Sequence, residues 1–310
     1  MLSTPTRGLL VALVAVASLS ANEALDLARQ ITKLTRTTLW VRQDAVAIRF
    51  KTHHPQGLVK IGNRLFLSSV EVTVPTRRLP AAIDGLDRDT GEGVGHLFQF
   101  DLAGNLIADL TLGEGAIYHP GGLDYDGRHI WVAVAEYRPN SRSIVYRIDP
   151  QTMAANEVFR FDDHLGALVH DTDDHALHAV SWGSRTFYRW PLSRDGRVRN
   201  AGVRTSAQST VNPSHYVDYQ DCKYAGQRRM LCTGVTEMRV TPDDPPFRLG
   251  GIELVSLRDH RPLHQAPLLL WTRGLDLTHN AVWLEATASG VRGYFVPEDD
   301  DSTLYVYETK

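Results

Sequence analysis

Residues 119–132, HPGGLDYDGRHIWV, contain the pattern that decides the fold. A short apolar run leads into the turn-forming pair Asp126-Gly127 and is followed by a second run rich in β-branched and aromatic residues. Asp and Gly readily adopt the backbone angles of tight hairpin turns. The stretch therefore predicts two antiparallel strands joined by a short turn.

Related stretches recur along the chain, and each begins with histidine. They read HPQGLVKIGNRLFL (54–67), HLGALVHDTDDHAL (164–177), HYVDYQDC (215–222) and HNAVWLEA (279–286). A third alternating strand follows in every unit, and a fourth follows in the first four units. Four short strands repeated with a period of roughly 50 residues are typical of β-propeller blades.

The repeat count predicts a five-bladed, all-β propeller with four-stranded blades over residues 22–310. The last unit ends after its third strand, so we expect an N-terminal segment, around residues 31–40, to supply the outer strand and close the ring. A sixth blade would have to fit into residues 22–50, which is too short. A β-sandwich is the alternative, although it does not explain the fixed strand order.

The N-terminus and the cysteines predict export. Arg7 precedes an apolar run over residues 8–19 that is too short to span a bilayer, so residues 1–21 are expected to be a cleaved signal peptide, with an uncleaved anchor as the alternative. We expect a secreted or periplasmic protein with no membrane span after cleavage. Cys222 and Cys232 flank a turn-like segment, which favours a disulfide over a two-cysteine metal site.

The net charge of −3 and the scattered Lys and Arg residues argue against a nucleic-acid partner. No GxSxG, phosphate-loop or HExxH motif occurs, which disfavours serine-hydrolase, nucleotide-dependent and zincin chemistry. The partner we expect is a small-molecule or carbohydrate substrate.

The most specific signal is the histidine that opens each innermost strand. These residues are His54, His119, His164, His215 and His279. Inner strands line the channel of a propeller, so the five imidazoles are expected to converge at one mouth. Such a ring suits a divalent or transition metal ion (Zn, Mn, Fe or Cu). In the alternative, each histidine makes a repeated structural hydrogen bond to the neighbouring blade.

Carboxylates at the ends of the second strands are expected near the same mouth. Glu71 and Glu136 each lie 17 residues after a ring histidine. We predict that Glu71, Glu136 and His119 take part in acid–base chemistry, or that the carboxylates orient metal-bound histidines. Equivalent positions elsewhere offer Trp182, Glu237 and Glu298, with Asp299 beyond. Gln56, Asp124, Asp218 and Gln220 are expected on inner strands, either in the channel or in contacts between blades. Insertions over residues 74–95 and 238–249 are expected on the face that carries the histidines.

The blade pattern and the HPQG and HPGG openings resemble the β-propeller superfamily over about residues 36–310. More narrowly, they resemble a group of exported propeller-like proteins with a histidine at the start of each blade. The resemblance implies the fold, whereas the chemistry has to come from the site. We expect a secreted metal-dependent hydrolase or lyase acting at the histidine-lined mouth. The alternatives are a non-catalytic binding propeller, lectin-like or protein-docking, with structural histidines, and a metal-free lyase or isomerase with a histidine base.

Overall fold

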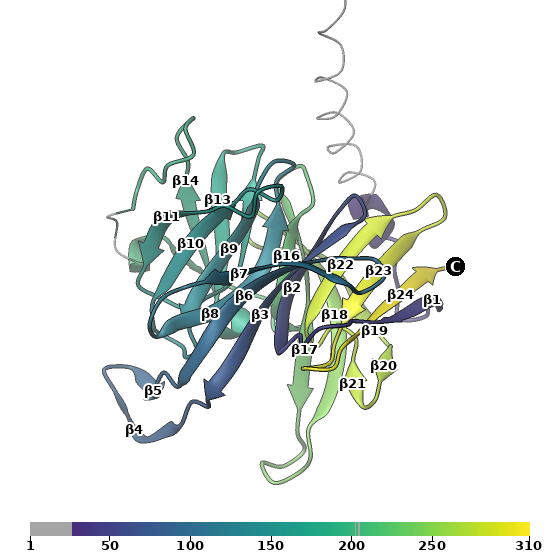
Figure 1. The fold of residues 1–310 in the computed structure, drawn as a ribbon, viewed down its shortest axis with the longest axis horizontal. Coiled ribbons are helices and arrows are strands. Elements are labelled where there is room, and N and C mark those ends of the chain that lie inside the picture. The colour runs from purple at the N-terminus through teal and green to yellow at the C-terminus, as the bar shows by residue number, and fades with distance from the viewer. Residues whose placement is uncertain (1–26, 202, 204) are drawn as a thin grey trace, which may run out of the picture.

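Five four-stranded antiparallel sheets surround a central axis (Figure 1). This arrangement, seen in a computed structural model that describes residues 27–201, 203 and 205–310, confirms the predicted five-bladed propeller. The signal peptide predicted over residues 1–21 lies outside the described residues. None of the helices in the described ranges is long and apolar enough to cross a membrane.

Each blade runs from an inner strand at the axis to an outer strand. The first blade contains β2 (His54–Ile61), β3 (Arg64–Val74), β6 (Glu92–Asp101) and β7 (Leu106–Leu112). The second contains β8 (Ile117–Tyr125), β9 (Ile130–Glu136), β10 (Ser143–Ile148) and β11 (Ala155–Phe161). The third contains β12 (Leu165–Asp171), β13 (Ala176–Ser181), β14 (Thr186–Pro191) and β15 (Ser209–Val211). The fourth contains β16 (Asp218–Tyr224), β17 (Arg229–Met238), β18 (Phe247–Ser256) and β19 (Pro262–Leu268). The fifth contains β22 (Ala281–Ala286), β23 (Val291–Val296), β24 (Thr303–Thr309) and β1 (Trp40–Ala47).

An N-terminal strand closes the fifth blade, as predicted. β1 pairs antiparallel with β24, from Trp40 opposite Thr309 to Ala47 opposite Thr303. The strand begins at Trp40, however, and not around residue 31 as expected. Residues 27–31 form a helical turn instead, and Ile31 and Leu34 pack into the core beside the last two blades. Ala28 and Ile31 lie three residues apart within this turn, so they share one face of it and are both buried, which explains the difference.

The cores lie between neighbouring blades. One cluster joins Val59 and Phe66 of the first blade to Leu123 and Val132 of the second. Successive side chains of a strand point to opposite faces of its sheet, so each blade contributes apolar residues to the cores on both of its sides. The channel-lining edges of the blades are thereby held at fixed positions around the axis.

Buried polar groups occupy the middle of the axis. The Asp221 carboxylate accepts backbone N–H groups of Leu58 (2.8 Å), Leu123 (3.0 Å) and Val282 (3.4 Å). These residues belong to three other inner strands, β2, β8 and β22. Lys223 donates to Asp221 and, at 2.5 Å, to the carbonyl of Leu123.

Asp124 likewise accepts backbone N–H groups of His170 on β12 and Tyr224 on β16. It therefore makes contacts between blades, which is one of the two roles predicted for it. Cys222 and Cys232 are direct partners across β16 and β17, and the predicted disulfide is present.

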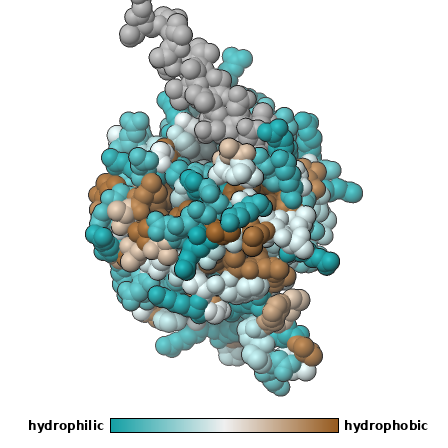
Figure 2. All heavy atoms as spheres, turned by 90° about the vertical axis from the view of Figure 1, so that its right-hand side faces the viewer, coloured by the Kyte–Doolittle hydropathy of each residue, from teal (hydrophilic) through white to brown (hydrophobic). Residues whose placement is uncertain are grey.

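Two projections extend from one face of the ring (Figure 1). They are the hairpin of β4 (Arg78–Ile83) and β5 (Leu86–Arg88) and the connection between β17 and β18. A short hairpin of β20 (Trp271–Thr272) and β21 (Leu275–Asp276) lies near the second one. Hydrophobic surface gathers at the lower tip in Figure 2, where Met238, Val240 and Phe247 are exposed. Both insertions thus lie on the same face, as predicted.

Candidate functional site

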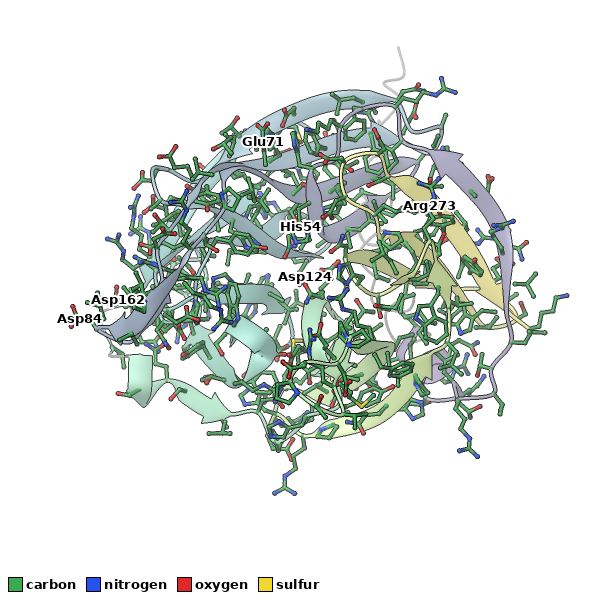
Figure 3. All side chains as sticks on the ribbon, turned by 90° about the horizontal axis from the view of Figure 1, so that it is seen from below. His54, Glu71, Asp84, Asp124, Asp162 and Arg273 are labelled. Atoms are coloured by element: carbon green, nitrogen blue, oxygen red, sulfur yellow. A yellow bond between two sulfur atoms is a disulfide. The ribbon has the colours of Figure 1, made fainter. Side chains whose placement is uncertain are left out.

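A cavity of about 270 Å³ opens at the mouth of the channel. Four of the five predicted ring histidines line it, namely His54, His119, His164 and His279. The other lining residues are Gln56, Tyr137, Gly166, Ser181, Trp182, Gly183, Asp218, Tyr219, Gln220 and Asn280. Figure 3 shows His54 near the axis when the ring is viewed from below, the face on which the hairpins project. The propeller therefore brings most of the repeated histidines to one site.

His215 does not line this cavity. It lies three residues before the start of β16 and is exposed. Arg185 contacts its ring, with Nη1 of Arg185 2.7 Å from Nδ1 of His215. It thus lies in the connection before β16, beside Arg185 and apart from its four counterparts.

His54 is held by a carboxylate. Its Nδ1 lies 2.9 Å from Oδ1 of Asp299, and the same oxygen accepts Nδ2 of Asn280 at 3.1 Å. A carboxylate accepts but does not donate, so the Nδ1 of His54 carries a proton, and Nε2 is the ring nitrogen that can exchange a proton with a ligand. Burial raises the pKa of Asp299, but the hydrogen bond and charge of His54 outweigh it and leave that pKa lowered. The arrangement is that of an oriented imidazole base.

His119 and His164 are buried and uncharged at neutral pH. Burial lowers the pKa of His164 to about 4, and its Nδ1 donates to the backbone carbonyl of Glu136 at 2.8 Å. Burial, and then the neighbouring His164 and His54, hold the pKa of His119 well below its usual value. The ring of His119 stacks on Tyr137 with centroids 4.1 Å apart. The cavity wall thus presents neutral imidazoles and not a cluster of positive charge.

The ring histidines that line the cavity include one close pair, His119 and His164, whose ring centroids are 5.6 Å apart. Among the described residues, the group whose possible metal-ligating atoms all lie within 4.8 Å of one another is a different one, His53, Glu71 and His96. Metal binding by the ring histidines stays a prediction. The group that the structure brings together includes one predicted residue, Glu71, and two that sequence reasoning did not identify.

The two predicted glutamates lie outside the cavity lining. Glu136 is 1% exposed, and its carboxylate pairs with Arg138 (2.6 Å) and Arg142 (2.8 Å). Its contribution near the cavity is the backbone carbonyl that holds His164. Glu71 lies between His53 and His96, at about 4.0 Å from each.

Tyr137 and Asn280 are cavity residues that sequence reasoning missed. Tyr137 directly follows Glu136 at the end of β9, and Asn280 directly follows His279. Burial, and then the charge of Asp299, raise the pKa of Tyr137, so its hydroxyl keeps its proton. The signal that would have found both residues is their place beside the repeated positions already singled out.

The β4–β5 hairpin borders the cavity. The guanidinium of Arg88 lies over the ring of Trp182, 5.2 Å from its centroid. Arg138 donates to the carbonyl of Arg88 (3.3 Å) and Asn140 to that of Gly85 (3.0 Å), which fasten the hairpin to the second blade. The predicted insertion therefore forms part of the rim.

Residues 10–310 match a family described as a family of unknown function, DUF6454. The chain belongs to the DUF6454 family. No curated protein matches its sequence. The function of this DUF6454 protein must therefore be inferred from the chemistry of the cavity, since propellers carry many unrelated activities.

Proposed function

We propose that this DUF6454 protein is an exported enzyme that binds a small carbohydrate-like molecule in the axial cavity and removes a proton from it, as a lyase or isomerase. The observation that carries the proposal is the hydrogen-bonded pair of His54 and Asp299, with His54 on the cavity wall. The disulfide and the predicted signal peptide are consistent with export.

His54 is suited to act as the base. The Nδ1–H bond to Asp299 fixes the tautomer and orients the ring, and the carboxylate stabilises the imidazolium formed when Nε2 takes a proton. An imidazole removes a carbon-bound proton at neutral pH when a neighbouring carboxyl or carbonyl group acidifies it. The substrate class is therefore an acidic sugar or a keto compound.

Tyr137 is suited to act as the acid. Its hydroxyl stays protonated because burial raises its pKa, and its ring is fixed against His119. In a β-elimination, His54 takes the proton from carbon, a carbon–carbon double bond forms, and the bond to the leaving oxygen breaks. Tyr137 gives its proton to that oxygen. Each transfer thus has a donor and an acceptor on the cavity wall.

The rest of the lining supports a sugar-like ligand. Trp182 and Tyr137 offer aromatic faces, on which the apolar face of a sugar ring can pack. Gln56, Gln220 and Asn280 offer amide donors and acceptors for hydroxyl groups.

The test is a panel of uronate-containing oligosaccharides incubated with the purified protein in the presence of a chelator. Elimination is followed by the ultraviolet absorbance of the new double bond conjugated to the carboxylate. We expect His54→Ala to lower turnover by about 10²- to 10⁴-fold, the range for loss of a positioned base. Tyr137→Phe should lower turnover and leave sugar binding, measured by thermal shift, in place.

His175→Ala is the matched control, since this histidine is exposed, does not line the cavity and lies in the turn that joins β12 and β13, at the other end of β12 from His164. Full turnover by His54→Ala would overturn the proposal. Sugar binding that is lost in Trp182→Ala, without turnover by the wild-type protein, would instead identify a lectin-like binding propeller.

A further inference from the structure

We propose that His53, Glu71 and His96 form a binding site for a divalent transition metal ion, with Zn²⁺ as the ion that fits best. The site belongs to the first blade and does not include any residue that lines the axial cavity. It stands independently of the proposed enzymatic function.

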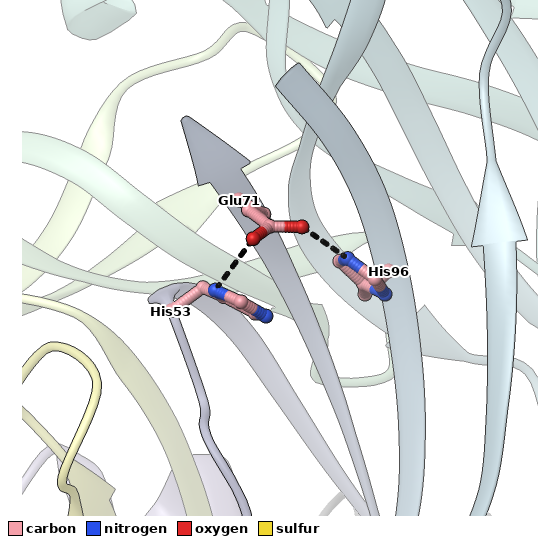
Figure 4. A group of neighbouring side chains, drawn as sticks. All are labelled: His53, Glu71 and His96. Carbon is pink, nitrogen blue, oxygen red and sulfur yellow. Dashed lines mark ion pairs between the residues drawn. The ribbon is translucent and has the colours of Figure 1, made fainter. Parts of the chain in front are cut away.

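The three side chains come from adjacent segments of one blade. His53 directly precedes β2, Glu71 lies on β3 and His96 on β6. The Glu71 carboxylate lies between the histidines and turns one oxygen to each (Figure 4). Oε1 is 4.0 Å from Nδ1 of His53, and Oε2 is 4.0 Å from Nε2 of His96.

The geometry of His96 leaves one ring nitrogen for an ion. Its Nδ1 lies 3.0 and 3.2 Å from the two carboxylate oxygens of Asp109, so Nδ1 carries a proton. Its Nε2 is buried and has no hydrogen-bond partner in the described part of the chain. This nitrogen lies 4.0 Å from Oε2 of Glu71. An ion bound between the two atoms would give both of them a partner.

Asp109 accepts a hydrogen bond from the ring nitrogen of His96 that faces away from Glu71, as carboxylates commonly do for metal-bound histidines. Donation of the other ring N–H to a carboxylate fixes the tautomer and makes the ligating nitrogen more basic. The ring of His96 also packs against two other rings. It stacks on Phe98 (centroids 4.9 Å apart) and on His53 (5.2 Å apart). The ligand is thus oriented before an ion arrives.

Binding requires a modest contraction. Tetrahedral Zn²⁺ at 2.0–2.2 Å from nitrogen and oxygen holds its ligand atoms about 3.3 Å apart, whereas these atoms lie within 4.8 Å of one another. The His53 and His96 rings are nearly parallel, with an interplanar angle of 13°, so one of them must turn to direct its lone pair at a shared ion. His53 is the freer of the two, because it lies in a connection and not within a strand.

Two histidines and one carboxylate match the ligand types of open zinc and non-haem iron sites, where the remaining positions take water or substrate. The side chain of Glu71 is 39% exposed, so the open positions are accessible to solvent. Three protein ligands and this exposure favour an exchangeable ion over a structural ion that is fully enclosed by four protein ligands.

The test uses the untagged protein after metal removal with a chelator, titrated with ZnCl₂ in a calorimeter and with Co²⁺ as a coloured substitute. We expect one equivalent to bind, with visible Co²⁺ absorption typical of a low-coordinate site. His96→Ala and Glu71→Gln should weaken binding by roughly 100-fold or more, and Asp109→Asn by about 10- to 100-fold. Glu71→Gln preserves shape, and the melting temperature of each metal-free variant checks its fold.

His175→Ala and His279→Ala are controls that should bind as the wild type does. Absence of stoichiometric binding to the wild type would overturn the proposal. The proposal would also be overturned if one equivalent of metal ion still bound to both Glu71→Gln and His96→Ala. If His279→Ala then lost that ion, the ion would be bound among the axial histidines. Because turnover is not measured, failure here leaves the role of His54 unaffected.

Discussion

His54 Nδ1 lies 2.9 Å from Asp299 Oδ1, and this contact joins the first residue of β2 to the loop between β23 and β24. The first and last blades therefore meet at the cavity through one hydrogen bond. The side chain of Asp299 is 57% exposed and that of His54 is 27% exposed, so the pair lies at the cavity entrance and not in the core.

Asp299→Asn removes the negative charge that stabilises the imidazolium of His54 while keeping the side-chain shape. We expect turnover to fall by about 10- to 1000-fold with little change in sugar affinity, because the charge matters after proton transfer. Steady-state kinetics separates the two effects. The neighbouring Asp301→Asn serves as the control, and a variant whose KM alone changes would assign Asp299 to substrate binding.

Acidification should destabilise the fold through buried histidines such as His164. The unfolded imidazole takes a proton near pH 6.5, whereas burial lowers the folded pKa to about 4. Stability is thus complete above pH 6.5 and falls as the pH drops toward 4, with His164 contributing on the order of 3 kcal/mol. Asp124 opposes this trend, because burial raises its pKa to about 6 and the folded state takes up that proton first.

Urea unfolding of the wild type and His164→Gln at pH 7.5 and 4.5 isolates the effect. The variant should lose less stability between the two pH values, by about 3 kcal/mol. His175→Gln should show the wild-type difference because this residue is exposed. Equal pH dependence in all three proteins would contradict a neutral, buried His164.

Asp221→Ala should destabilise the protein by about 3–5 kcal/mol, because it leaves the buried Lys223 without its counter-charge. It also leaves three backbone N–H groups of other blades without their acceptor. Combining Asp221→Asn with Lys223→Met should restore part of this loss, since neither member of the pair then carries a charge. Urea midpoints provide the measurement, and a double variant less stable than Asp221→Ala would argue against the charge as the cause.

Replacing both Cys222 and Cys232 with serine should lower stability by about 2–3 kcal/mol, since the disulfide closes a short loop in the unfolded chain. Reductant should destabilise the wild type in urea and leave the double variant unchanged. A double variant as stable as the oxidised wild type would show that the cross-strand pairing of β16 and β17 suffices.

Most of the fold could be predicted because each blade repeats the same hydrophobic alternation. HPGGLDYDGRHIWV and its relatives fall on the first two strands of successive blades, and the closing strand follows from the missing fourth strand of the last unit. The start of that strand was predicted wrongly. Ala28 and Ile31 lie three residues apart, a spacing that fits one face of a helix and not one face of a strand, and both pack against the last two blades.

The site was harder to predict than the fold. A repeat fixes the strand on which a residue lies, but turn length decides where its side chain goes, as the exposed position of His215 shows. His53 was hidden beside His54 in the sequence. His53 has a left-handed backbone conformation (φ 55°) just before the strand that His54 begins, and the two rings belong to separate clusters. His96 carried no repeat signal, because its meaning depends on contacts with Glu71 and Asp109.

The pairing of β1 with β24 also constrains how the molecule is made. β1 is synthesised before the other described strands of the ring, whereas its partner β24 is synthesised after them. Until then the ring stays open at one seam, and its N-terminal strand has an unmatched edge. Closure of the propeller is therefore a late event, and loss of either β1 or β24 should leave the same fifth blade incomplete.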